Sequence, residues 1–257
     1  MPLLQVQGVT KRFGGVTAVN DASMSAGEGS ITALIGPNGA GKTTLFNVIT
    51  GFEAASEGRI VFDGEEVRGK KPWQVARLGM VRTFQTPVGF PTLSVWDNLM
   101  VSGASDEAES LWRAIAGRRA WGPPLESVEL RAEEVLRDLG LWDRRDRLIE
   151  DLGAGEQKLV EFARQLVNEP RMLLLDEPAS GVDPVGIGKL RELILSLKQG
   201  GLSMVVIDHN LGFILSIADT VYVLAEGSVI AHGPPDTIAQ DPRVIETYLG
   251  QTDEEAA

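Results

Sequence analysis

The sequence predicts an α/β fold with a parallel-sheet core, an antiparallel β region near the N-terminus and a helical insertion. Three observations support this prediction. Strands and helices alternate after residue 170. The continuous apolar run 172–175 is typical of a strand that is buried on both faces of a parallel sheet. Residues 94–167, in contrast, are rich in helix-like patterns, and apolar residues recur at helical spacing over 131–139.

The N-terminal part of the chain shows the patterns of several strands and one helix. Residues 3–32 alternate apolar and polar positions and contain few helix formers, which predicts a small antiparallel sheet. The apolar run 31–35 predicts a strand that leads through a glycine-rich stretch into a helix over 42–49. A further strand is predicted at 59–62, because the turn signal Asp63-Gly64 follows it.

After residue 170, apolar runs predict strands with helices between them. The predicted strands are 172–175, 203–207 and 221–224, and the predicted helices are 186–198 and 210–218. We therefore expect one domain in two parts. Residues 1–86 and 166–257 form the core with its β region, and residues 87–165 form a helical subdomain.

The composition excludes several classes of protein. The chain has 257 residues, of which 43% are hydrophobic, so it can bury a core and is not expected to be disordered. Its formal net charge of −12 argues against nucleic-acid binding and against direct attraction to an anionic bilayer. The lack of cysteine excludes disulfides, thiolate metal sites and a cysteine nucleophile. Because neither a signal peptide nor a run of eighteen apolar residues is found, we expect a cytoplasmic protein that reaches a membrane only through a partner.

Residues 36–43 match the phosphate-binding loop G-x-x-x-x-G-K-[ST]. The glycines let the backbone curl so that N–H groups point at phosphate oxygens, and the following helix presents its positive end to the same anion. Lys42 is expected to bridge the β- and γ-phosphates, and Thr43 to ligate Mg²⁺. A glycine-rich turn is the alternative, but the predicted strand before the loop and the helix after it favour nucleotide binding. The predicted nucleotide-binding residues here are Gly36, Pro37, Asn38, Gly39, Ala40, Gly41, Lys42, Thr43 and Thr44.

Two carboxylates follow the predicted strand 172–175. Asp176 stands where P-loop enzymes hold Mg²⁺ through water, and Glu177 can polarise an attacking water. Neighbouring side chains of a regular strand point to opposite faces, so both carboxylates can meet one phosphate only if the chain turns at Pro178. An ordinary acidic strand end is the alternative. Paired with the loop at 36–43, the two carboxylates favour catalysis.

Together these motifs resemble the ATP-binding subunits of ABC transporters, and the resemblance covers residues 3–250. It implies a P-loop NTPase core, ATP and Mg²⁺ as cofactors, and ATP hydrolysis that powers transport. It also implies that Glu177 is the catalytic glutamate and that His209 contacts the γ-phosphate. Gln85 resembles the glutamine that touches Mg²⁺ and couples to the membrane subunits, and residues 179–183 resemble the D-loop.

The stretch 152–157, Leu-Gly-Ala-Gly-Glu-Gln, resembles the family's signature motif Leu-Ser-Gly-Gly-Gln. The serine that contacts the partner's γ-phosphate is replaced by Gly153, which removes a donor worth about 1–3 kcal/mol where a charged acceptor depends on it. Backbone N–H groups and the helix dipole remain, so we expect ATP binding with slow hydrolysis unless the partner's site compensates. The implied contacts to nucleotide are Gly153, Ala154, Gly155 and Glu156.

Two further positions are assigned by the resemblance. Phe13 stands where an aromatic residue stacks on adenine, although a single aromatic residue in a strand is more often part of a core. Asn210 follows His209 where the family often has aspartate, and we expect this change to weaken the orientation of the histidine.

Within the family, four stretches resemble the uptake systems for branched-chain amino acids and for urea. They are 11–16, 46–51, 82–85 and 244–250. The resemblance implies membrane permease subunits as partners, a second ATP-binding subunit (identical or different) bound head to tail, and an extracytoplasmic substrate-binding protein that acts indirectly. It implies a position on the inner face of the cell membrane and no nucleic acid. Amino acids are the favoured cargo, and urea or short amides are the alternative.

Three other readings of the sequence stay open. A non-transport ABC ATPase of translation or DNA repair usually carries two cassettes or a long coiled coil, and this sequence shows neither. A P-loop kinase or GTPase would leave Gln85, His209 and the stretch 152–157 without roles. A degenerate cassette that binds ATP only as a dimer scaffold is kept open by Gly153.

Overall fold

The structure, a computed structural model, describes residues 2–83, 89–103 and 122–249. Two compact units are present. The first consists of Met1–Gln85 and Arg171–Ala257, and the second is the intervening segment Thr86–Pro170. Each unit has a hydrophobic core of its own, and each is described separately.

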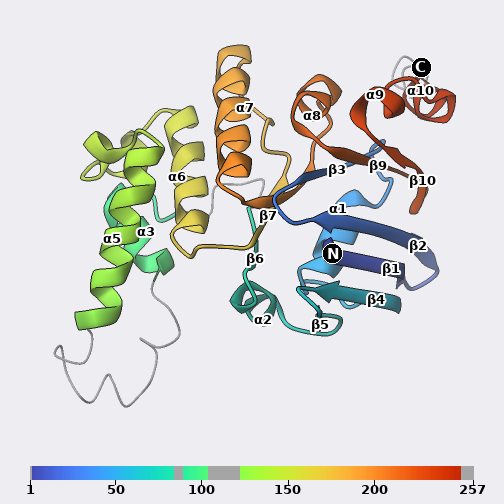
Figure 1. The fold of residues 1–257 in the computed structure, drawn as a ribbon, viewed down its shortest axis with the longest axis horizontal. Coiled ribbons are helices and arrows are strands. Elements are labelled where there is room, and N and C mark those ends of the chain that lie inside the picture. Colours follow the sequence, from blue (N-terminus) through green and yellow to red (C-terminus); the bar gives the residue numbers. More distant parts are fainter. Residues whose placement is uncertain (1, 84–88, 104–121, 250–257) are drawn as a thin grey trace. The chain divides into compact units, whose positions relative to one another are not determined.

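The first unit contains an antiparallel sheet built by the N-terminal residues. Its strand order is β2-β1-β4-β5, and every pairing is antiparallel (Figure 1). The strands are β1 (Pro2–Phe13), β2 (Val16–Gly27), β4 (Glu57–Phe62) and β5 (Glu65–Glu66). In β2, the buried residues Ala22, Met24 and Ala26 alternate with exposed ones, which is the pattern of a sheet with one face in the core. The antiparallel β region predicted from the sequence is confirmed.

A second, six-stranded sheet has the order β10-β9-β3-β8-β7-β6. The five strands from β9 to β6 run parallel, and β10 joins the edge antiparallel to β9. The strands are β3 (Ile31–Ile35), β6 (Met80–Arg82), β7 (Met172–Asp176), β8 (Ser203–Ile207), β9 (Thr220–Ala225) and β10 (Ser228–Gly233). β3, β7 and β8 are buried along their whole length, as their apolar runs predict. The parallel core of the predicted α/β fold is therefore confirmed.

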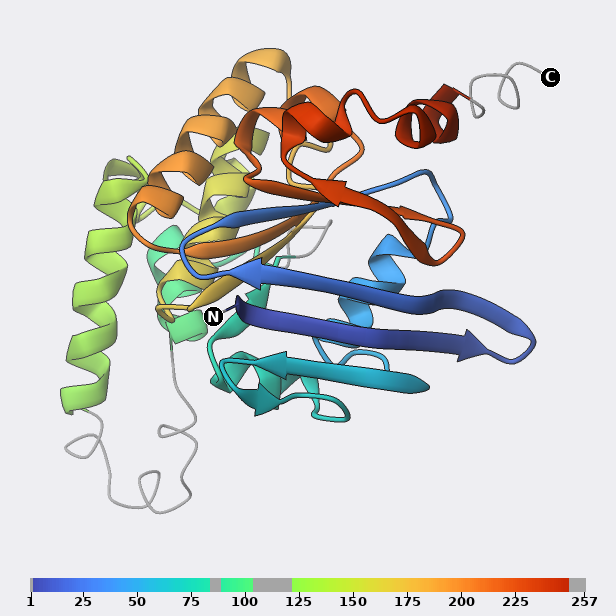
Figure 2. The ribbon, with the colours of Figure 1, turned by 45° about the vertical axis from the view of Figure 1, so that its right-hand side comes forward.

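The helices of the first unit cover both faces of the six-stranded sheet. They are α1 (Lys42–Ile49), α2 (Pro72–Arg77), α7 (Pro184–Gln199), α8 (Leu211–Ile217), α9 (Pro235–Ile238) and α10 (Pro242–Leu249). Leu45, Phe46 and Ile49 of α1 belong to a core that strands of both sheets share, so α1 lies between the two sheets (Figure 2). α7 and α8 lie on the opposite face of the six-stranded sheet (Figure 1).

The second unit is helical in its described residues. Its helices are α3 (Val95–Gly103), α5 (Gly122–Asp138) and α6 (Ala154–Leu166), with 3₁₀ turns at Trp142–Arg144 and Ile149–Asp151. One face of each helix enters a common core that includes Leu99, Leu136 and Val160. In the parts of the chain that the structure describes, every helix is too short or too polar to cross a bilayer.

Candidate functional site

Three neighbouring parallel strands bring the predicted residues to one edge of the six-stranded sheet. β8 lies between β3 and β7, and all three run in the same direction. The loop that starts at Gly36 follows β3, Glu177 follows β7, and Asp208 follows β8. Carboxyl ends of parallel strands form the usual ligand-binding edge of an open α/β sheet.

The loop from Gly36 to Gly41 needs glycine because other backbone segments approach it closely. Gly36 has a φ of 153°, and a Cβ atom there would lie 2.0 Å from the carbonyl oxygen of Leu224. Gly41 has a φ of 96°, and a Cβ atom there would lie 2.2 Å from the carbonyl oxygen of Ala18. β9 and β2 thus hold the loop in a conformation that only glycine adopts without strain.

The loop ends at the N-terminus of α1, which has no side-chain cap. Gly41 is the N-cap residue and provides no side-chain hydrogen bond, and the first turn contains no acidic residue. The first N–H groups of a helix lack intrahelical partners, and they form its positive end. Thr43 is exposed in this first turn. The N-terminus of α1 therefore suits an anion such as phosphate.

Lys42 lies inside the loop and is only 9% exposed. Its Nζ donates to the carbonyl oxygens of Gly36, at 2.7 Å, and of Pro37, at 2.8 Å. Burial lowers the pKa of Lys42, while the charges of Glu177 and Asp176 act to raise it. The charges of both carboxylates at the end of β7 therefore act on Lys42. A phosphate would supply the buried ammonium group with a direct counter-charge.

The carboxylate of Asp176 is 3% exposed and is engaged through one oxygen. Oδ2 accepts a hydrogen bond from Nη2 of Arg82 at 2.6 Å. Oδ1 is buried and has no hydrogen-bond partner among the described residues. An anionic oxygen in that state can accept from a water molecule or face a cation.

The chain leaves β7 at Glu177 and turns through Pro178, where the sequence predicts the turn, and the N–H of Ser180 donates to the carbonyl oxygen of Glu177 at 3.1 Å. Glu177 has a φ of 49°, in the left-handed region, and its N–H donates to the carbonyl oxygen of Ile207 at 2.8 Å. Because the backbone leaves the strand conformation at Glu177, the side chains of Asp176 and Glu177 do not follow the strict alternation of a regular strand. The sequence predicted the turn at Pro178 but not the left-handed conformation of Glu177 just before it.

The residues at this edge suit a magnesium ion that is bound by protein oxygens and by phosphate oxygens together. Mg²⁺ prefers oxygen ligands and is usually held by one or two carboxylates together with substrate phosphates. Asp176 offers the unpartnered Oδ1, and Thr43 offers an exposed hydroxyl at the loop. Within the described ranges, no group of three His, Asp or Glu side chains could hold a metal ion by itself. Metal binding here would therefore depend on the nucleotide.

The residues after β8 form a second anchored turn. Asp208 is fully buried, and its carboxylate accepts from the N–H groups of Ala179 and Asn210, each at 2.9 Å. The side chain of His209 is 63% exposed, with Nδ1 3.8 Å from Oδ1 of Asp208. Asp208 thus ties the segment after Glu177 to the segment that carries His209. Sequence reasoning missed Asp208, although an acidic residue at the end of a buried strand was visible.

Asn210 has a local role that explains its side chain. It is the N-cap residue of α8, and its Oδ1 accepts from the N–H of Phe213 at 3.0 Å. Asparagine and aspartate cap helices about equally well. The helix predicted to start at residue 210 therefore starts at Leu211, and the exchange from aspartate keeps the cap. Asp183 caps α7 in the same way, by accepting from Val185 and Gly186.

Phe13 lies at the end of β1 and is 45% exposed, so it is not a core residue. Nζ of Lys11 lies 4.5 Å from the centroid of its ring. Lys11 is itself held by Oε2 of Glu53, at 2.8 Å, and by the carbonyl oxygen of Ala54, at 3.0 Å. The ring is thus presented to solvent and supported by a fixed cation.

The signature-like stretch lies in the second unit, at the start of α6. Gly153 is the N-cap residue, and its N–H donates to Oε2 of Glu156 at 3.2 Å. Oε1 of Glu156 accepts from Nε of Arg144 at 3.1 Å, and this hydrogen bond is the main cause of the lowered pKa of Glu156. Ala154 and Gly155 are exposed in the first turn. Gln85, the remaining predicted site residue, lies outside the described residues.

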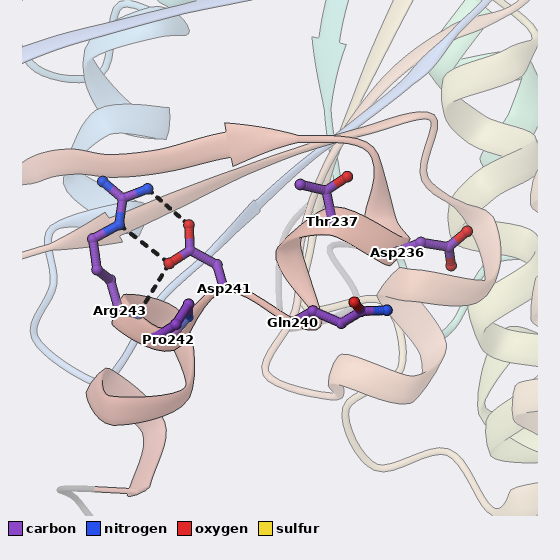
Figure 3. A pocket seen from close by; sticks show the side chains of 6 residues that line it. All are labelled: Asp236, Thr237, Gln240, Asp241, Pro242 and Arg243. Atoms are coloured by element: carbon purple, nitrogen blue, oxygen red, sulfur yellow. Dashed lines mark hydrogen bonds and ion pairs between the residues drawn. The ribbon is translucent and has the colours of Figure 1, made fainter.

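A cavity of about 750 Å³ lies elsewhere in the first unit, at α9 and α10 (Figure 3). Its lining consists of Asp236, Thr237, Gln240, Asp241, Pro242 and Arg243. Figure 3 shows that Arg243 turns back onto Asp241, with Nη2 2.7 Å from Oδ2 and Nε 3.1 Å from Oδ1. None of the predicted site residues lines this cavity. In the first unit, the residues predicted to bind phosphate and metal lie at the edge of the six-stranded sheet instead.

Known proteins resemble the chain over nearly its whole length. Residues 19–180 match the ABC transporter family, and residues 228–254 match the family described as branched-chain amino acid ATP-binding cassette transporter. A probable branched-chain amino acid transport ATP-binding protein of Archaeoglobus fulgidus is 38% identical over 255 residues, which cover 99% of this chain and 98% of the relative. A high-affinity branched-chain amino acid transport ATP-binding protein of Escherichia coli is 37% identical over 255 residues, which cover 97% of this chain and 98% of the relative.

Solved structures of similar proteins show the same fold. The ADP conformation of an ATP-binding cassette of an ABC transporter superimposes with a TM-score of 0.85 at 35% identity, covering 97% of this chain and 99% of that chain. A nucleotide-free ATP-binding cassette of an ABC transporter superimposes with a TM-score of 0.84 at 36% identity, covering 96% and 99%.

Proposed function

The chain belongs to the ATP-binding cassettes of the ABC transporter family, and from this premise we propose that it hydrolyses ATP to power an importer of branched-chain amino acids. The relatives from Archaeoglobus fulgidus and Escherichia coli carry that transport role in their names. The match of residues 228–254 to the branched-chain cassette family favours amino acids over urea or short amides as cargo. The two units together are proposed to form one cassette.

The observation that carries the proposal is the arrangement at the sheet edge. Lys42 is buried in a glycine-dependent loop, and the charges of Asp176 and Glu177 both act on it. The N-terminus of α1 is uncapped in the same loop. A positive cradle for phosphates thus lies beside carboxylates that suit metal binding and base catalysis.

In the proposed reaction, the chain's own residues bind, orient and accept a proton. N–H groups of residues 36–44 and the ammonium group of Lys42 bind the β- and γ-phosphates. Thr43, Asp176 and Gln85 would hold Mg²⁺, which would neutralise charge on the transferred phosphoryl group. The carboxylate of Glu177 orients the attacking water and accepts its proton. His209 donates a hydrogen bond to a γ-phosphate oxygen, and Phe13 stacks on the adenine ring.

We further propose that the cassette works as a head-to-tail dimer, with an identical or a different partner. The exposed start of α6, with Gly153, Ala154, Gly155 and Glu156, would complete the partner's nucleotide site. Without the serine hydroxyl at Gly153, the backbone N–H groups and the dipole of α6 carry this contact, so slow turnover is expected unless the partner's site compensates. The dimer would bind permease subunits at the inner face of the membrane and serve an extracytoplasmic substrate-binding protein. The negative net charge supports attachment through a protein rather than through anionic lipid.

The test is Glu177→Gln, which removes the base but keeps the size of the side chain. We expect the variant to bind ATP, to form stable ATP-bound dimers in size-exclusion chromatography, and to lose nearly all turnover. Glu169→Gln is the matched control, because Glu169 also has a positive φ, of 48°, but lies after the end of α6 with an exposed side chain, and the variant should hydrolyse ATP as the wild type does. Full ATPase activity of the Glu177 variant would remove this residue from the catalytic role.

The transport role is tested with the complex of the chain and its permease. Proteoliposomes that contain the complex and ATP should accumulate labelled leucine, supplied with the substrate-binding protein, more than tenfold faster than those with Glu177→Gln. Uptake of labelled urea in place of leucine would contradict the proposed cargo while leaving the ATPase assignment intact.

A further inference from the structure

Arg82 joins two parts of the nucleotide site that lie far apart in the sequence. It is the last residue of β6 (Met80–Arg82), at the edge of the six-stranded sheet beside β7. Nη1 donates to Oδ1 of Asn47 in α1 at 2.6 Å, and Nη2 donates to Oδ2 of Asp176 at 2.6 Å. A single guanidinium group thus connects the helix that follows the phosphate-binding loop with the carboxylate that ends β7.

The surroundings of Arg82 favour one fixed position for this group. The side chains of Arg82 and Asp176 are 7% and 3% exposed, so water screens their ion pair only weakly. The rings of Phe46 and Phe52 have centroids 5.8 Å and 5.9 Å from Cζ of Arg82. Phe46 is fully buried in the core between the sheets. The guanidinium plane is therefore held by two hydrogen bonds and by aromatic contacts, which is more restraint than an ammonium group can receive.

The two oxygens of Asp176 are consequently not equivalent. Oδ2 is committed to Arg82, whereas Oδ1 is buried without a hydrogen-bond partner among the described residues. Lys42 is a second cation whose charge interacts with Asp176. The hydrogen bond from Arg82 to Oδ2 therefore opposes a rotation of the carboxylate toward Lys42.

We propose that Arg82 is a positioning residue that fixes Oδ2 of Asp176 and so presents Oδ1 to the shell of the magnesium ion. This inference rests on the proposed function, because it assumes that Asp176 faces Mg²⁺. Residues that orient metal ligands from behind commonly change metal affinity by 10–100-fold when they are replaced. Arg82 would act in the same way, through Asp176, without touching the nucleotide or the ion.

The test measures binding rather than turnover, on the full-length chain. Fluorescent mant-ADP is titrated in EDTA and then at rising Mg²⁺, for wild type, Arg82→Met and Arg82→Lys. In Arg82→Met we expect the half-saturating Mg²⁺ concentration to rise by about tenfold, with mant-ADP affinity in EDTA unchanged within about twofold. Arg82→Lys should show most of this rise, because a lysine keeps the charge but cannot bridge Asn47 and Asp176 with a planar fork.

Two further variants control for charge and for folding. Arg59→Met removes an arginine of the same unit that pairs with Glu66 and is 57% exposed, and it should leave the Mg²⁺ dependence unchanged. Asn47→Ala removes only the second anchor of Arg82. It should raise the half-saturating Mg²⁺ concentration in the same direction but less, and it keeps the test valid should Arg82→Met fail to fold.

Three results would overturn the inference. An unchanged Mg²⁺ dependence in folded Arg82→Lys and Asn47→Ala would show that Asp176 needs no positioning. A lower half-saturating Mg²⁺ concentration would show that Arg82 repels the ion. An equal loss of mant-ADP affinity in EDTA and in Mg²⁺ would show a general role in the loop. Wild-type protein without Mg²⁺-dependent mant-ADP binding would instead refute the proposed function, and this inference with it.

Discussion

The left-handed backbone of Glu177 leads to a prediction that separates stability from catalysis. Glu177 has a φ of 49°, a conformation in which the Cβ atom of an L-residue costs roughly 1–2 kcal/mol. Glycine avoids this cost but gains about 0.4–1 kcal/mol of additional chain entropy in the unfolded state. The midpoints of these two ranges, about 1.5 and about 0.7 kcal/mol, predict that Glu177→Gly is more stable than Glu177→Ala by about 0.8 kcal/mol.

The comparison of these two variants is informative because neither carries the carboxylate. Both lose the same charge next to Asp176 and Lys42, so that loss cancels. The N–H of Glu177 that donates to Ile207 is a backbone group and stays in both. For a chain of this size, the free-energy difference corresponds to a melting temperature higher by about 1–4 °C for the glycine variant. Both variants should have almost no ATPase activity.

Glu169 provides the matched control for this prediction. Its φ is 48°, and it lies after α6 with a side chain that is 71% exposed. Glu169→Gly should exceed Glu169→Ala in melting temperature by a similar amount, with ATPase activity retained in both. Thermal denaturation monitored by circular dichroism, together with an ATPase assay, measures both properties. If Glu177→Ala melts at or above Glu177→Gly while the Glu169 pair behaves as expected, the strain argument for the catalytic glutamate is refuted.

Two further predictions concern the ends of helices. Asn210→Asp should change the unfolding free energy by less than about 0.5 kcal/mol because either residue caps α8, whereas Asn210→Ala should lower it by about 1 kcal/mol in urea denaturation. An Asn210→Asp variant with markedly faster ATP hydrolysis would show that residue 210 also affects the orientation of His209, so that capping is not its only role. Arg144→Ala should lower the melting temperature slightly at pH 7, because Arg144 lowers the pKa of Glu156 and this pair stabilises the fold only while Glu156 is ionised. The difference should be complete above the ordinary glutamate pKa of about 4.3 and should vanish as the pH falls through the lowered folded pKa; a difference that persists at pH 2 would speak against the ion pair.

Local patterns were sufficient to predict most elements of the first unit. The helix at 42–49 and the strand at 203–207 were predicted with the bounds that the structure shows, because an apolar run or a loop motif marks both ends. The predicted strand 221–224 extends by one residue at each end in β9, and the helix at 186–198 begins earlier, at Pro184. Asp183 is the reason for that earlier start, since it caps α7 through Val185 and Gly186.

Only part of the candidate site could be predicted from the sequence. The phosphate-binding loop, the acidic pair and the turn at Pro178 were visible in the sequence, whereas the left-handed conformation of Glu177 was not, since no local signal indicates it. Within the second unit, Val95 is fully buried in the core, whereas Phe90 is exposed. A periodic apolar pattern cannot tell these two situations apart.

By itself, the sequence determined the order of elements and the chemistry of the loop at 36–43, because periods of 2 and 3.6 residues and a glycine-lysine spacing are local properties. Only the tertiary structure decided that Gly36 and Gly41 must be glycine on account of the backbones of Leu224 and Ala18. It alone decided that Arg82 pairs with Asp176 and that Asp208 anchors Ala179. These contacts join residues 94 and 29 positions apart, and they exist because packed parallel strands bring distant segments together at one edge.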